Sequence, residues 1–429
     1  MERLVRHVNG AVPGPESIRL LALAEAIEGP AVARQPSIVW QRASGVHVQD
    51  VDGNVFLDFT SSVLVAAVGH GHPRVVEAIK EQADELLHSY NFVNSWRVEL
   101  ETKLVERSRP HGLDRVFIAT TGAELIELAL KLGRWKSGRT GVLALEGGYH
   151  GKTMAATAVG GQAKAREGLG EILAGVVHLP FPALGDEEAE RDALERLWML
   201  DGQSIGTVVL EVFQGNAGQR ITSARFLSEL ERWSREHEAV LVIDETQSAF
   251  GRAGTMFSFE QFGLGPDLVV AGKGISSSLP LTVLFGRRDV FDAAPARALS
   301  STHGGNPMSC RAACVVLDLL DELDLLSNSQ EVGAHLAAAL REAVAASGVE
   351  AEVRGTGLML GVEILDGDGR PDSARAKAIV EHAISRGLLL LSPIGIGKNV
   401  VRVSPPLVIT REMAGEGAAI MAEALAAVA

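Results

Sequence analysis

The residues best suited to chemistry follow two apolar runs in the second half of the chain. Asp244 ends the run Ala239–Asp244, and Gln247 stands three residues later. Lys273 follows the run Asp267–Ala271 and comes 29 residues after Asp244 (273 − 244). Open α/β sheets bind ligands at the carboxyl ends of their strands, and a desolvated lysine can act as a Schiff-base nucleophile because burial lowers its pKa. A salt-bridged pair at the strand ends is the simpler alternative.

A second candidate is the segment Thr120–Glu124, between an apolar run and an amphipathic stretch. Thr121 is a good helix N-cap, and the N–H groups of Gly122 and Ala123 could bind a phosphate at the helix N-terminus. An N-cap without a ligand is the alternative.

The segment Gly147–Thr153 is a third candidate. Tyr149 and His150 form an aromatic pair that could cover a flat ring, and Lys152 could bind an anion. A flexible loop with a partly packed tyrosine is the alternative. A phosphate cradle, a stacking aromatic ring, a carboxylate for a pyridinium nitrogen and a Schiff-base lysine are together what pyridoxal phosphate requires.

The elements that must position these residues alternate along the middle of the chain. Short, almost wholly apolar runs between helical patterns predict a mostly parallel sheet covered on both faces. The expected strands are 116–119, 141–145, 207–212, 239–244, 267–271 and 282–285. Amphipathic helices are expected around 125–132 and over 226–237.

The flanks differ from this pattern. Residues 45–59 alternate and carry Asp52-Gly53-Asn54, which predicts a hairpin. A long helix is expected over 311–326, and an Ala-rich helix at the C-terminus. We therefore expect an α/β fold with a large domain over residues 60–310. A smaller α+β domain is expected from residues 1–59 and 311–429.

Composition excludes several classes of protein. The 429 residues carry 40 Lys+Arg against 54 Asp+Glu, a net charge of −14, so binding to a nucleic-acid backbone is not expected. No apolar run approaches the ~20 residues that span a bilayer, and the start lacks a secretory signal. Cys310 and Cys314 fit neither a disulfide framework nor a zinc site, and His70 with His72 lacks a third ligand. We expect a cytoplasmic enzyme with no metal.

At this point the sequence resembles a known family, the class-III pyridoxal-phosphate aminotransferases of fold type I. The resemblance covers nearly the whole chain and rests on the order of its motifs. These are 52–54 (DGN), 69–73 (GHGHP), 244–254 (DETQSAFGRAG), Lys273, 302–307 (THGGNP), 354–357 (RGTG) and 401–407 (VRVSPPL). Each motif alone is weak to moderate, but their joint order is highly specific.

The resemblance implies a role for each candidate. Lys273 would form the Schiff base with the cofactor and move the proton between Cα and C4′. Asp244 would keep the pyridine nitrogen protonated, and Gln247 would hydrogen-bond the 3-oxygen of the ring. Tyr149 would stack on the ring, with His150 beside it.

The remaining cofactor contacts implied by the resemblance involve the phosphate and its surroundings. Thr121, Gly122 and Ala123 would bind the phosphate. Thr302 would reach the phosphate of the neighbouring subunit, so a homodimer is expected. Glu211 matches a glutamate at a strand end near the cofactor.

Departures from the family pattern concern the substrate. Asn216 stands where one branch of the family has a glutamate that pairs with the arginine of the Arg-x-x-Pro-Pro motif, here Arg402. We therefore expect Arg402 to be available to a substrate carboxylate, which an arginine binds in a bidentate manner. Lys152 stands where many relatives that use 2-oxoglutarate have an arginine. Tyr90 falls in a segment that lines the substrate entrance in relatives.

Three functions follow. The first is an aminotransferase that moves an amino group between an amine or amino acid and a 2-oxo acid by a ping-pong route. The second is an amino-acid racemase or epimerase, which differs in whether the proton returns to C4′ or to the opposite face of Cα. The third is a non-catalytic relative, against which the joint presence of Lys273, Asp244, Gln247 and Thr302 argues.

Overall fold

The computed structural model of the protein describes residues 4–32, 35–36 and 38–429, which form two units. The sheet unit comprises Arg74–Gly251 and Thr255–Leu323, and the terminal unit comprises the chain up to Pro73, Arg252–Gly254 and Asp324–Ala429. The domain boundaries expected at 59/60 and 310/311 stay a prediction.

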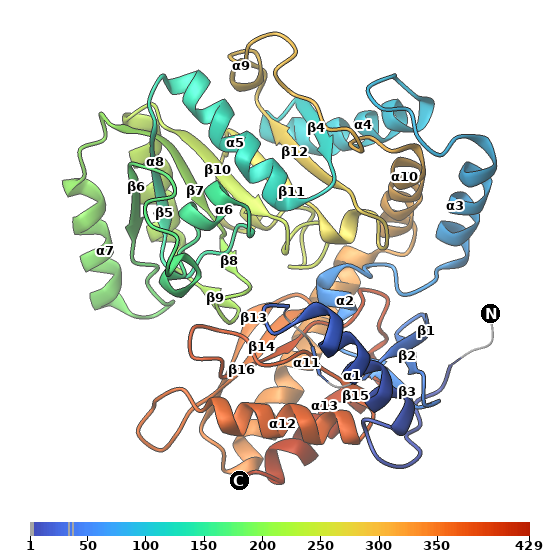
Figure 1. Ribbon diagram of the computed structural model, residues 1–429. Coiled ribbons are helices and arrows are strands. Elements are labelled where there is room, and N and C mark those ends of the chain that lie inside the picture. The colour runs from blue at the N-terminus through green and yellow to red at the C-terminus, as the bar shows by residue number, and fades with distance from the viewer. Residues whose placement is uncertain (1–3, 33–34, 37) are drawn as a thin grey trace. The chain divides into compact units, whose positions relative to one another are not determined.

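A seven-stranded sheet forms the centre of the sheet unit, in the order β4-β12-β11-β10-β7-β5-β6 (Figure 1). Strand β12 runs antiparallel to both of its neighbours, and the other pairings are parallel. The strands of the unit are β4 (Arg115–Ala119), β5 (Gly141–Leu145), β6 (Val176–Leu179), β7 (Ile205–Leu210), β8 (Phe213–Gln214), β9 (Arg220–Ile221), β10 (Val240–Glu245), β11 (Leu268–Ala271) and β12 (Thr282–Gly286). The predicted mostly parallel sheet is confirmed.

The central strands of this sheet are buried along their whole length, because helices cover both of its faces. The helices of the unit are α3 (Pro73–Glu85), α4 (Ser95–Ser108), η1 (Arg109–His111), α5 (Gly122–Ser137), α6 (Met154–Val159), η2 (Ala163–Arg166), α7 (Glu187–Met199), α8 (Ala224–Glu236), η3 (Ser258–Phe262), η4 (Lys273–Ile275), α9 (Arg288–Phe291) and α10 (Pro307–Glu322). In Figure 1, α5 crosses the strands on the face towards the viewer.

Helix α5 packs closely on one face of the sheet, against the strand side chains that point to that face. Leu125, Ala129 and Leu132 of the helix share one buried cluster with residues such as Val209 of β7. Gly133 brings the helix backbone against β7, because a Cβ at Gly133 would lie 2.1 Å from Thr207 Oγ1. Only glycine allows this approach, and it fixes where the helix N-terminus lies relative to the strand ends.

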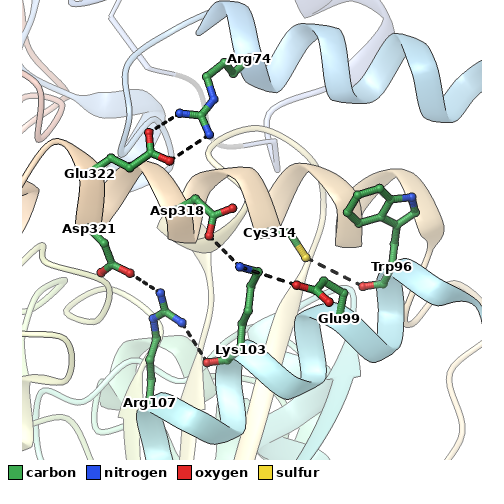
Figure 2. A network of polar contacts seen from close by, with 9 residues as sticks. All are labelled: Arg74, Trp96, Glu99, Lys103, Arg107, Cys314, Asp318, Asp321 and Glu322. Carbon is green, nitrogen blue, oxygen red and sulfur yellow. Dashed lines mark hydrogen bonds and ion pairs between the residues drawn. The ribbon is translucent and has the colours of Figure 1, made fainter.

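A network of ion pairs joins α3, α4 and α10 on the surface of the sheet unit (Figure 2). Lys103 Nζ on α4 lies 2.7 Å from Asp318 Oδ1 on α10. Arg107 Nη2 lies 2.5 Å from Asp321 Oδ2, and Arg74 of α3 pairs with Glu322. Each of these three carboxylates on α10 therefore has a cation from another helix.

Two buried cysteines lie on the same helix. Cys314 Sγ lies 4.0 Å from the backbone oxygen of Trp96 on α4. Burial raises the pKa of the Cys314 thiol to about 12 and that of the Cys310 thiol further still. Both thiols are free and stay in the protonated form at neutral pH.

The terminal unit holds two smaller sheets, β1-β2-β3-β15 and β13-β14-β16. The predicted hairpin is confirmed: β2 pairs antiparallel with β3, and Asn54 N donates to Asp50 Oδ1 (2.8 Å) across the turn. The elements of the unit are α1 (Pro15–Glu28), β1 (Trp40–Ser44), β2 (His47–Asp50), β3 (Val55–Asp58), α2 (Ser61–Leu64), α11 (Leu325–Ser347), β13 (Ala351–Thr356), β14 (Met359–Ile364), α12 (Ser373–Ser385), β15 (Leu388–Leu389), β16 (Val400–Val403) and α13 (Arg411–Ala426).

The long helix predicted over 311–326 is wrong at its end. Helix α10 ends at Glu322, and α11 begins at Leu325. Asp324 between them has φ +48°, a left-handed conformation that no α-helix continues through. Within the described ranges, no helix combines the length and the apolar character needed to cross a membrane.

Candidate active site

The carboxyl ends of the parallel strands meet at one edge of the large sheet. The segments that follow them line a single cavity of about 270 Å³ within the sheet unit. Its lining residues are Gly122, Ala123, Tyr149, His150, Gly151, Lys152, Glu211, Asp244, Thr246, Gln247 and Lys273. Residues that the sequence spreads over β4–α5, β5, β7, β10 and β11 are therefore brought together.

The N-terminus of α5 supplies backbone donors to this cavity. Thr121 is the N-cap, and its Oγ1 accepts a hydrogen bond from Glu124 N (3.3 Å). The first N–H groups of a helix have no partner within the helix, and here they belong to Gly122 and Ala123. With the positive end of the helix dipole, they form a site suited to an anion.

Asp244 is held as an anion by its neighbours. Its Oδ2 lies 2.9 Å from His150 Nδ1, and its Oδ1 accepts a hydrogen bond from Thr246 N (2.9 Å). Burial alone would raise the pKa of Asp244, but the hydrogen bond and charge of His150 and the backbone N–H of Thr246 outweigh it, so the pKa lies below its ordinary value. A buried, ionised carboxylate can stabilise a protonated ring nitrogen.

His150 shows the reciprocal effect. Burial opposes a charge on its imidazole, yet the hydrogen bond to Asp244 outweighs burial and raises the pKa of His150. The His150 side chain is fully buried and that of Asp244 is 5% exposed, so the pair is protected from water. The hydrogen bond to His150 Nδ1 orients the Asp244 carboxylate.

Glu211 holds the loop that carries Tyr149. Its Oε1 accepts a hydrogen bond from Tyr149 N (2.8 Å), and its Oε2 from Gly215 N (3.4 Å). Burial raises the pKa of Glu211 to about 7, with the nearby charge of Asp244 acting in the same direction and His150 against it. The tyrosine ring itself is half-buried, and burial raises its pKa.

Glu127 on α5 holds the far end of the same loop. Its Oε1 accepts hydrogen bonds from Thr153 Oγ1 (2.6 Å) and from Ala155 N (2.9 Å). The segment that presents Tyr149, His150 and Lys152 is thus bound at both ends by carboxylates of the sheet unit. Sequence reasoning missed Glu127, because nothing in its helical spacing indicates that it bonds a loop.

Lys273 follows β11 with a backbone that an L-residue rarely adopts. Its φ is +47°, in the left-handed region, and it begins the short helix η4. Preceding Gly272 has no room for a side chain, since a Cβ there would lie 2.6 Å from Thr282 Cγ2. Strain of this kind concentrates at functional sites.

Several polar atoms at the cavity fit a ligand. Among the described residues, Gln247 Oε1, Thr246 Oγ1 and His150 Nε2 are buried without a hydrogen-bond partner. The helix N-terminus suits a phosphate, Asp244 suits a pyridinium nitrogen, and Lys273 suits an aldehyde. The residues present therefore fit pyridoxal phosphate. Thr246 was missed by the sequence reasoning, although it stands between two predicted site residues.

Four predicted site residues do not line this cavity. Thr121 lines a neighbouring, more apolar cavity with Leu279 and Pro280. Thr302 is exposed in the loop before α10, and Tyr90 is 48% exposed with φ +50°. Arg402 lies on β16 of the terminal unit, where it is 2% exposed. Their functional roles stay predictions.

Comparisons with known proteins agree with this geometry. The sequence matches the aminotransferase class-III family over residues 30–425. It is 32% identical to an alanine/serine racemase of Pyrococcus horikoshii, over 96% of this chain and 91% of that protein. It is 33% identical to a 5-aminovalerate aminotransferase of Pseudomonas aeruginosa, over 90% of this chain and 93% of that protein.

Solved structures agree as well. The fold matches an amine transaminase from an uncultivated Pseudomonas species in its PLP-bound form, with a TM-score of 0.85 and 30% identity, over 94% of this chain and 97% of that one. Pyridoxal phosphate is thus the cofactor, as expected. The chain belongs to the class-III aminotransferases, pyridoxal-phosphate-dependent enzymes of fold type I.

Proposed function

We propose that Lys273 is the residue that binds the cofactor covalently and moves the substrate proton. The observation that carries this proposal is the cavity itself, which gathers Lys273, Asp244 and the N-terminus of α5 around one space of about 270 Å³. When bound, pyridoxal phosphate supplies an electron sink for the bond broken at the substrate Cα. The lysine amine would hold or release the substrate proton at Nζ.

The remaining cavity residues bind and orient. The N–H groups of Gly122 and Ala123, with Thr121 as N-cap, hold the phosphate. Asp244, oriented by His150, keeps a negative charge at the ring nitrogen. The role of Asp244 is supported by its 2.9 Å hydrogen bond to His150 and by the burial of both side chains.

Tyr149 and Gln247 complete the proposed cofactor site. Tyr149 covers one face of the ring, because its loop is fixed by Glu211 at the backbone N–H. Gln247 donates a hydrogen bond from its side-chain amide nitrogen to the ring's 3-oxygen, which its place in the lining of the cavity supports.

For the substrates, the family implies an amino donor and a 2-oxo acid acceptor. We propose that Arg402 binds the substrate carboxylate and that Lys152 and Tyr90 contribute to substrate binding. Arg402 is supported by its planar guanidinium, which matches a carboxylate with two hydrogen bonds. Lys152 is supported by its place at the cavity, where it is exposed and brings a point charge.

We also propose a homodimer in which Thr302 reaches the partner's phosphate site. The segment before α4 supports a protein contact here, since its apolar side chains are exposed. They are Leu86, Leu87, Phe92 and Val93. Light scattering on the purified protein tests this, and a monomer at micromolar concentration would contradict it.

A racemase is the second candidate function, because an alanine/serine racemase is among the similar proteins. Both reactions use the same lysine and differ only in where the proton returns. Incubating the holoenzyme with single amino acids and no acceptor separates them. Release of the oxo acid with loss of the bound aldehyde form indicates transamination, and loss of optical purity indicates the isomerase.

The Lys273 assignment has its own test. Sodium borohydride reduction of the parent enzyme should fix the cofactor to the peptide that contains Lys273. Lys273→Ala should abolish this reducible chromophore. A variant that keeps the chromophore would overturn the assignment of the site.

A further inference from the structure

Glu245 is a buried carboxylate next to Asp244 for which the proposed chemistry has no use. It is the last residue of β10 and is fully buried. Successive side chains of a strand point to opposite faces, so Asp244 lines the cavity and Glu245 points away from it. Burying a carboxylate is costly unless its oxygens are bonded, so its partners show what it holds in place.

Four donors surround this carboxylate. Oε2 accepts hydrogen bonds from Ser248 Oγ (2.9 Å) and Ser258 N (2.8 Å). Oε1 accepts hydrogen bonds from Ser258 Oγ (2.6 Å) and Phe259 N (2.8 Å). Each oxygen therefore receives one hydroxyl and one backbone N–H.

These donors enclose the turn that carries Gln247. Ser248 N and Ala249 N both bond the backbone oxygen of Glu245, at 3.2 and 3.1 Å. The Ser248 hydroxyl closes the same turn on its other side through the Glu245 side chain. Thr246 and Gln247 are thus held between two residues that bond each other through both backbone and side chain.

The bonds from Ser258 and Phe259 fix the turn from a second direction. These residues begin helix η3, which the chain reaches after a loop closed by Phe250 N to Met256 O (2.7 Å). The carboxylate therefore ties the start of this loop to its end. Burial raises the pKa of Glu245, and the hydrogen bonds of Ser258, Phe259 and Ser248 act against that rise.

We propose that Glu245 is a positioning residue for the cofactor, acting through Gln247 and Thr246, whose buried oxygens it presents to the cavity. Gln247 Oε1 and Thr246 Oγ1 have no hydrogen-bond partner within the described part of the chain. The backbone of this turn sets the positions of both oxygens relative to a ligand. A displacement of about 1 Å is enough to lose such contacts. This inference rests on the proposed cofactor site.

The substitution Glu245→Gln tests the proposal without changing the size of the side chain. An amide nitrogen donates, and each carboxylate oxygen faces a backbone N–H that also donates. The serine hydroxyls can rotate to accept, but the N–H groups of Ser258 and Phe259 cannot. Whichever way the amide lies, one N–H is left facing a donor, so the loop must move.

Three measurements on the full-length protein give the readout. Hydrogen exchange in the cofactor-free protein should become faster at the amides of 246–249 and 255–259. Titration with pyridoxal phosphate should show a Kd raised about tenfold or more, as expected when an active-site turn shifts. Visible circular dichroism of the bound cofactor should change in Glu245→Gln, since this signal reports how the ring is held.

Asp267→Asn is the matched control. Asp267 directly precedes β11 and lies beside the start of β10, where its Oδ2 accepts a hydrogen bond from Leu241 N (2.9 Å). The same change from carboxylate to amide there should lower the melting temperature and leave the Kd and the dichroism unchanged. If Glu245→Gln only lowers the melting temperature, as the control does, the positioning role is wrong.

Ser248→Ala covers the case in which Glu245→Gln does not fold. It keeps the carboxylate and three of its four donors. It removes the bond that closes the Gln247 turn and, with it, the hydrogen bond that Ser258 Oγ donates to Ser248 Oγ (3.0 Å). We expect a Kd raised about threefold and faster exchange over 246–249. Unchanged exchange and unchanged Kd in this variant would overturn the proposal.

Failure of the cofactor site itself gives a different pattern. If the parent protein bound no pyridoxal phosphate, or if Lys273→Ala kept the reducible chromophore, the assignment of the cofactor site to this cavity would be wrong. The exchange experiment needs no cofactor, so its result would still show whether Glu245 holds the turn.

Discussion

The carboxylates around the cavity and those along helix α10 meet opposite surroundings. Asp244 and Glu211 are 5% and 4% exposed, and they are hydrogen-bonded to a histidine and to backbone N–H groups. Asp318 and Glu322 have side chains 35% and 52% exposed and are paired with Lys103 and Arg74. These ion pairs of α10 are thus partly exposed, whereas the side chain paired with Asp244 at the cavity is the buried imidazole of His150.

This difference decides what each group can do. A buried carboxylate takes its protonation state from a few fixed neighbours, so one site can hold Asp244 ionised and Glu211 with a pKa of about 7. A surface carboxylate is surrounded by water and salt, and its pair contributes little. We therefore expect the cavity region to carry the chemistry and the helical region to carry a small share of the stability.

The largest effect is expected from Asp244→Asn. The change removes the negative charge that faces the cavity and leaves His150 without its anionic partner. We expect kcat to fall about a hundred- to thousandfold, as for the loss of one fixed electrostatic contact in an active site. Steady-state kinetics measure it. A fall of less than about fivefold would mean that the cavity carboxylate is no more important than a surface one.

Glu211→Gln should change how stability depends on pH. The native pKa of about 7 lies above the ordinary value of 4.5, so the folded protein keeps a proton that the unfolded chain releases. Stability contributed by this group is therefore lost as the pH rises from about 4.5 to about 7, by up to about 3 kcal/mol.

Urea unfolding of the cofactor-free parent and of Glu211→Gln, at about pH 5 and about pH 7.5, isolates this contribution. The variant should lose less stability than the parent between the two values. Equal losses would show that Glu211 titrates as an exposed carboxylate does.

A smaller effect is expected from Asp318→Asn in the surface network. Its bond to Lys103 Nζ (2.7 Å) is partly exposed, so its loss should cost about 0.5–1 kcal/mol at low salt. The difference should shrink as salt screens the pair. Unfolding at two salt concentrations measures this, and kcat should be unchanged. A salt-independent loss would indicate a packing effect.

The smallest effect is expected from Arg74→Gln. Arg74 and Glu322 have side chains 48% and 52% exposed, so water replaces their pairing readily. We expect no measurable change in melting temperature or activity. A clear loss of stability here would mean that the helical network acts cooperatively, and the contrast with the cavity would be weaker.

Much of the sheet and part of the site could be predicted from the sequence. The central strands are apolar runs, and the hairpin turn at 52–54 has its own residue signature. Strand β6 was missed, because Val176–Leu179 is short and includes His178. The break at Asp324 was missed as well, since the helical pattern continues through it.

The site was predictable where one residue type at a strand end defines it, as for Asp244, Gln247 and Lys273. Glu245, Glu127 and Thr246 could not be assigned in this way. Their importance depends on partners distant in the sequence, such as Ser258 and Phe259 for Glu245, and local spacing does not encode such partners.

Gly133 has a consequence for redesign of the enzyme. It lies eleven residues along α5 from Gly122 (133 − 122), which at 1.5 Å per residue is roughly 16 Å of a stiff rod. A methyl group at Gly133 would collide with Thr207, so the Thr207 side chain would have to move or the axis of α5 would have to tilt. Such a tilt would displace the helix amides at the cavity without touching any residue there. Changes to this glycine should therefore alter cofactor affinity from a distance, and libraries aimed at the site should leave it fixed.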